Sequence, residues 1–163
     1  TTNNIIPGHA ELVLNCRFYS EKVKARVYAA IERVVNAEEL ASGSLDEATV
    51  SYFAHGELLD NDEAVFTRVR EQFDGVFGDA SVTADPKTVS EDFPVIGQAY
   101  GAPYFFWLVG CTPRDVWDKA VAEDRVGEDV PVNHMPTFLP EYEPTIAAAT
   151  RAAATAALTY LAR

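Results

Sequence analysis

The sequence predicts an α/β protein, because segments with strand-like alternation are separated by segments with helical periodicity. Apolar and polar residues alternate over residues 10–19, which is the pattern of a half-buried strand. Apolar residues then recur at helical spacing over residues 21–41, directly after Ser20, a residue that can cap a helix. Residues 48–54 read as a second strand, so the first third of the chain predicts a β-α-β unit.

The remainder of the chain continues this alternation. A turn-rich stretch at residues 56–62 marks a domain boundary, and Asn61 or Asp62 is expected to cap the helix that follows. Residues 104–110 are apolar on both faces, as in a central strand with helices on either side. The other expected elements are a short strand at residues 81–84, a short helix at residues 114–123, a loop at residues 125–140 and an alanine-rich helix at residues 141–162.

The composition argues against some classes of binding partner and favours one cellular compartment. The 163 residues include 25 acidic and 13 basic side chains, a formal net charge of −12. Such a surface repels phosphate groups, so neither nucleic acid nor an anionic membrane is an expected partner. The longest apolar run, Pro103–Gly110, is about half of what a bilayer span needs. Cys16 and Cys111 are far apart without CxxC spacing, which favours a reducing cytoplasm over a disulfide framework.

Few side chains have the types and spacings that catalysis requires. The sequence contains no HExxH, no glycine-rich phosphate loop and no GxSxG. His9 and His55 occupy positions typical of solvated loop histidines, whereas His134 lies in a proline-rich loop before the last helix. A histidine held there can be a zinc ligand or an ordinary loop residue. The adjacent carboxylates Glu91 and Asp92 can cap a helix, or one of them can face a metal or a substrate ammonium.

Four short motifs follow one another along the chain. They are Asn4-Ile5-Ile6-Pro7 with a strand-like segment ending at Arg17, then Ser90-Glu91-Asp92-Phe93, the apolar run Tyr104–Gly110, and Asn133-His134-Met135-Pro136-Thr137-Phe138. In this order they resemble the metal-dependent amidohydrolase and peptidase family of hippurate hydrolase and N-acyl-L-amino-acid amidohydrolase. That family has an Asn-Val/Ile-Ile-Pro turn and a strand ending Gly-Thr-Ile-Arg in its lid. Ser-Glu-Asp-Phe, an apolar strand and His-Asn/Ser-Pro-x-Phe follow downstream.

The resemblance implies an enzyme that cleaves the amide bond of N-acyl amino acids or related small amides and peptides. Two divalent ions, zinc or manganese, would activate a shared water, with a glutamate as general base. His134 would be a metal ligand, with Glu91 or Asp92 lining the pocket behind it. Arg17 would bind the carboxylate of the substrate, supported by Asn4. Without the resemblance, Arg17 is interpreted as part of a surface salt bridge and Asn4 as a turn residue.

The resemblance also assigns the two parts of the chain. Residues 1–57 would be part of a β-α-β, ferredoxin-like lid that pairs with a second subunit in a homodimer. Residues 58–163 would be the C-terminal segment of an α/β/α zinc-peptidase-like catalytic domain. The sequence departs from the family pattern at Gly8, Asn15-Cys16, Val89 and Met135, which affects the expected substrate more than the expected fold.

Most of the family's active site is expected outside this sequence. The other metal ligands and the general-base glutamate lie upstream of the lid in the family. The sequence begins Thr-Thr-Asn-Asn, without Met, which suggests a chain cut from something longer. We therefore expect this chain by itself to be inactive. Two other interpretations stay open: a stand-alone α/β module for dimerisation or small-molecule binding, and a family member that has lost catalysis.

Overall fold

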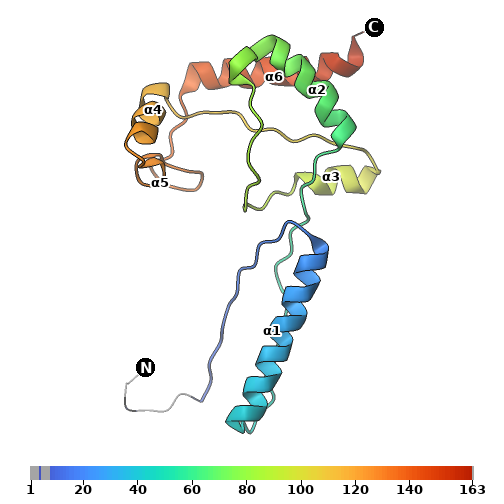
Figure 1. Cartoon of the computed structure of the whole chain (residues 1–163), viewed down its shortest axis with the longest axis vertical. Coiled ribbons are helices and arrows are strands. Elements are labelled where there is room, and N and C mark those ends of the chain that lie inside the picture. Colours follow the sequence, from blue (N-terminus) through green and yellow to red (C-terminus); the bar gives the residue numbers. More distant parts are fainter. Residues whose placement is uncertain (1–3, 5–7, 163) are drawn as a thin grey trace. The chain divides into compact units, whose positions relative to one another are not determined.

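The computed structural model describes residue 4 and residues 8–162, and in this part of the chain it contains six α-helices, one short 3-10 helix and no β-strand (Figure 1). The predicted α/β class is therefore wrong, and so are the β-α-β, ferredoxin-like lid and the α/β/α architecture. The chain divides into two compact units: Thr1–Asp60 with Pro86–Ile96, and Asn61–Asp85 with Gly97–Arg163. Their interpretation as lid and catalytic segment stays a prediction.

Helix α1, Glu21–Ser42, is the only α-helix that lies wholly within the described part of the first unit. Ser20 caps its start, since the Ser20 side chain accepts a hydrogen bond from the Val23 amide at 3.5 Å. Gly43 ends it in the left-handed region with φ 63°, where a residue without a Cβ has no steric penalty. The helix predicted over residues 21–41 is thus confirmed, because both of its end signals are local in sequence.

The segment after α1 is attached to the helix by side chains. The ring of Tyr28 on α1 stacks on that of Tyr52 with 4.6 Å between centroids, and Phe18 meets Tyr28 edge-on at 5.6 Å. The Tyr52 hydroxyl donates to Glu32 Oε1 at 2.8 Å, and the Ala48 amide donates to Glu39 Oε2 at 2.9 Å. These contacts hold residues 48–52 alongside α1.

Neither strand predicted in this unit forms. Residues 10–19 and residues 48–54 adopt no ladder pairing, and Leu12 is 83% exposed where the alternation predicted a buried face. An alternating pattern becomes a strand only when a second strand accepts its backbone hydrogen bonds, and no such strand exists among the described residues. The alternation agrees with the observed burial only at Cys16 and Phe18, which are half-buried, and the Phe18 ring meets Tyr28 of α1.

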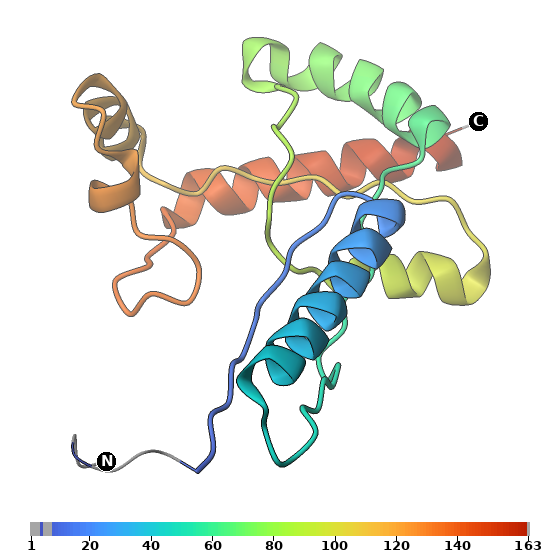
Figure 2. The same cartoon turned by 60° about the horizontal axis from the view of Figure 1, so that its bottom comes forward.

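The core of the second unit lies between α2, Glu63–Phe77, and α6, Tyr142–Leu161, which run side by side (Figures 1 and 2). Its buried residues are Val69, Phe73 and Ala152, with Val65, Phe77, Phe105, Trp107 and Ala156 packed around them. Arg68 fastens the two helices together, because its guanidinium donates to the Thr159 carbonyl at 2.7 Å and lies over the Tyr160 ring. The long C-terminal helix predicted over residues 141–162 is confirmed.

Asp62, not Asn61, is the cap of α2. The Asp62 carboxylate accepts a hydrogen bond from the Val65 amide at 2.9 Å. The end of α2 leads into the 3-10 helix η1, Gly78–Ala80. Arg70 then binds the Ser81 carbonyl and the Thr83 hydroxyl as well as Asp74. The strand predicted at residues 81–84 is wrong, since a side chain rather than another strand binds this segment.

Three further helices lie outside that core. Helix α4, Arg114–Ala122, matches the short helix predicted there. Helix α3, Phe93–Tyr100, and the single turn α5, Val126–Asp129, were not predicted. Arg125 stabilises α5 through two bonds to Asp129, of 2.9 and 2.8 Å, and this hydrogen-bonded guanidinium lowers the pKa of the Asp129 carboxyl. None of the helices in the described ranges is both long enough and apolar enough to span a bilayer.

Residues 104–110 do not form the predicted central strand. The segment between α3 and α4 is drawn as an open trace without a helix or a strand (Figures 1 and 2). Phe105 and Trp107 pack on Phe73 of α2, with ring centroids 6.2 and 5.6 Å apart. The segment thus has the helix layer expected on one face but no neighbouring strand in the described part of the chain.

Candidate functional site

The side chain of Arg17 contacts the Ser-Glu-Asp-Phe motif. Arg17 lies in the open segment before α1, and its Nη1 donates a hydrogen bond to Ser90 Oγ. Gly56 lies beside the same hydroxyl, since a Cβ at Gly56 would be 4.0 Å from Ser90 Oγ. Arg17 remains exposed, so the other N–H groups of its guanidinium are open to a ligand. Two motifs that are 73 residues apart are therefore joined in one unit.

Glu91 and Asp92 have different environments. Glu91 is half-buried, and its Oε1 accepts from the Asp92 amide at 3.0 Å and the Phe93 amide at 3.3 Å. This carboxylate therefore caps the start of α3, one of the two roles expected from the sequence. Asp92 is exposed, and its carbonyl accepts from the Val95 amide at 3.1 Å. Asp92 is accordingly the more open of the two carboxylates toward a ligand, and a role beside a metal stays a prediction for both.

His134 occupies a strained backbone position. The Met135 amide donates to the Val132 carbonyl at 3.1 Å, which closes a β-turn with His134 as its third residue. The φ of His134 is 72°, in the left-handed region that the third residue of a type II turn requires. Glycine is the residue that adopts this conformation at low cost, whereas an L-residue there costs on the order of 1–2 kcal/mol. Strain of this kind is often found at functional sites.

The surroundings of His134 supply no second ligand. The residue is exposed, and its imidazole makes no hydrogen bond or ion pair with any of the described residues. The orienting partner that a zinc-binding histidine usually has is therefore not among them. No group of three or more His, Cys, Asp and Glu side chains in the described part of the chain is arranged to hold a metal ion.

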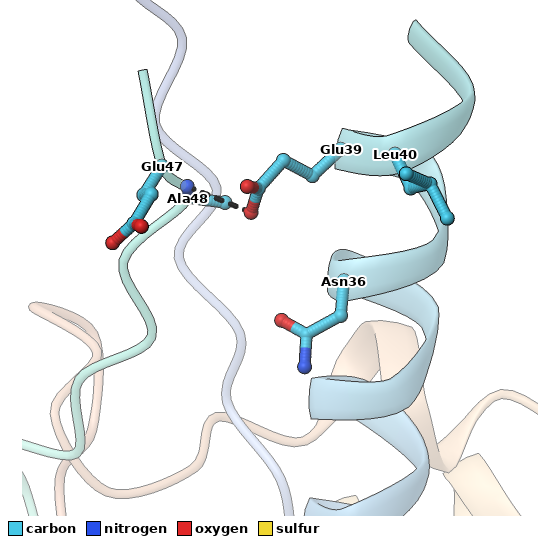
Figure 3. A pocket seen from close by; sticks show the side chains of 5 residues that line it. All are labelled: Asn36, Glu39, Leu40, Glu47 and Ala48. Carbon is cyan, nitrogen blue, oxygen red and sulfur yellow. Dashed lines mark hydrogen bonds between the residues drawn. The ribbon is translucent and has the colours of Figure 1, made fainter. Parts of the chain in front are cut away.

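Two shallow hollows lie on the surface. One, of about 300 Å³, adjoins the His134 loop, and its lining residues are Cys111, Thr112, Pro113, Val116, Asp129, Pro131, Thr137, Phe138 and Leu139. The other, of about 310 Å³, lies between the end of α1 and the segment after it, where the bond from Ala48 to Glu39 crosses one side (Figure 3). In that close-up the Asn36 and Glu39 side chains project from the helix toward the Glu47–Ala48 segment. Neither hollow is lined by a residue that the sequence singled out for chemistry.

Asn4 is exposed in a turn, and residues 5–7 of its motif lie outside the described residues. The structure thus brings Arg17 together with Ser90, beside Glu91 and Asp92 in sequence, while His134 belongs to the other unit. Ser90 has no sequence signal for a role of its own, because nothing local in the sequence links it to Arg17. No protein-family model matches the chain.

Proposed function

We propose that this chain is the C-terminal part of a metal-dependent amidohydrolase, a metallopeptidase-like enzyme of the hippurate hydrolase type. The observation that carries the proposal is the order of four motifs: the turn at Asn4 with Arg17, the Ser90–Phe93 motif, the apolar run at 104–110 and the His134 segment. The reaction proposed for the parent protein is cleavage of the amide bond of an N-acyl amino acid or a related small amide or peptide.

Two features of the geometry support this proposal. The first is the hydrogen bond from Arg17 to Ser90, because it joins the proposed carboxylate-binding residue to the second motif. A guanidinium with one N–H fixed by a hydroxyl retains other donors for a bidentate pair with a carboxylate. The second is the positive φ of His134, because it keeps an exposed imidazole at the tip of a turn where glycine would be less strained.

The described residues do not by themselves fit the proposed pair of zinc or manganese ions. A catalytic zinc needs three protein ligands, and His134 is the one candidate that the resemblance offers in this chain. Under the proposal, the remaining ligands and the general-base glutamate belong to the part of the parent protein that precedes Thr1. Residues 1–57 would then contribute to the lid and the homodimer, and residues 58–163 to the catalytic part.

The proposal is tested first on this chain and then on its gene. Isothermal titration of the purified chain should detect at most weak zinc binding, and no hydrolysis of N-benzoyl or N-acetyl amino acids is expected. Two tight zinc sites per chain would contradict the proposed division of ligands. The codons that precede Thr1 should encode a Gly-His-Asp-x-His segment and a Glu-Glu pair, and the product that includes them should hydrolyse these substrates and lose activity with chelator.

A second candidate is a non-catalytic module for dimerisation or small-molecule binding. It is favoured by the absence, among the described residues, of any cluster of metal-binding side chains. A start codon directly before Thr1 would support this module and contradict the amidohydrolase. A product with the upstream motifs that binds zinc but hydrolyses nothing would instead identify a family member that has lost catalysis.

A further inference from the structure

We draw no further inference here: the strongest candidate, the surface hollow of about 300 Å³ that Cys111, Asp129 and Phe138 help to line beside the His134 loop, carries nothing, because nothing in the structure shows what covers it.

Discussion

Asn61 binds Phe106 through both of its amide atoms, and in this way one side chain takes the place of a neighbouring strand. The Asn61 Oδ1 and Nδ2 atoms are 2.7 and 3.0 Å from the Phe106 amide nitrogen and carbonyl oxygen. Both partners are partly buried. The next residue, Asp62, caps α2, so the apolar segment and the helix that covers it are aligned by two consecutive residues.

We expect Asn61→Ala to destabilise the second unit by about 1–3 kcal/mol, because it removes two hydrogen bonds to the backbone of Phe106 in a partly buried place. Urea denaturation followed by tryptophan fluorescence measures the change, since Trp107 packs on Phe73 beside this site. Asn36→Ala, at an exposed position of α1, is the matched control and should change stability by less than about 0.5 kcal/mol. Equal midpoints for the two variants would show that the Asn61 amide contributes nothing.

Replacing His134 separates its backbone role from its proposed metal role. His134→Gly relieves the left-handed φ of 72°, so this variant should be more stable than His134→Ala by about 1 kcal/mol. Urea midpoints of the two variants of this chain test that order. In the upstream-extended gene product, both variants should lose bound zinc and activity to the same extent. Retained metal content in either variant would remove His134 from the proposed ligand set.

The Tyr52–Glu32 hydrogen bond predicts a pH dependence in the first unit. The Glu32 carboxylate, by accepting from the Tyr52 hydroxyl, raises the pKa of Tyr52 above its ordinary value of 10.0. A raised folded-state pKa gives stability that is fully present below the unfolded pKa, about 10, and is lost as pH rises through the folded value. Glu32→Gln should therefore lower the Tyr52 pKa, as measured by NMR titration of the labelled ring.

The wild type should lose stability as Tyr52 deprotonates, and Tyr52→Phe should lack this loss. Urea midpoints measured below and above pH 10 test the difference. Tyr100→Phe, a change at an exposed side chain of α3, is the control and should leave the pH dependence as in the wild type. The assignment would be wrong if Glu32→Gln left the Tyr52 titration where it is in the wild type.

The helices could be predicted from sequence where their signals are local. Ser20 before α1 and Asp62 before α2 are capping residues within four positions of the amides that they bind. The choice between Asn61 and Asp62 could not be made, because Asn61 is bound by Phe106, 45 residues away. Helix α3 was missed because its Pro94 and Gly97 are unfavourable in helix interiors, although Pro94 lies in the first turn, where proline is tolerated.

The predicted strands were wrong, because an alternating segment becomes a strand only with partners that its own residues do not reveal. Residues 10–19 and 104–110 have strand-like patterns, yet neither has a neighbouring strand in the described part of the chain. The contacts within the candidate site could not be predicted from the sequence for the same reason. The sequence supplied Arg17, Glu91 and His134 as residue types, but the pairing of Arg17 with Ser90 required the fold.

The pairing of Arg17 with Ser90 leads to the last prediction, which concerns the specificity of the proposed enzyme. If Arg17 binds the substrate carboxylate, Arg17→Lys should reduce kcat/KM for an N-acyl amino acid but change it little for the corresponding amide, which has no carboxylate. A lysine is a point charge and cannot form the bidentate pair, and losing a hydrogen bond to a charged group costs about 1.5–3 kcal/mol. The expected loss is therefore on the order of ten- to a hundredfold for the acid alone.

Ser90→Ala and Ser90→Thr test whether the Ser90 hydroxyl orients Arg17 for the substrate carboxylate. Alanine removes the hydroxyl that accepts from Arg17 Nη1, so KM for the acid should rise, by less than in Arg17→Lys, with kcat nearly unchanged. Threonine retains the hydroxyl and should restore most of the acid's kcat/KM. The assay is run on the upstream-extended gene product with acid and amide in parallel. Equal losses on the two substrates would mean that Arg17 and Ser90 only hold their segments together, and the role of Arg17 in carboxylate binding would then be withdrawn.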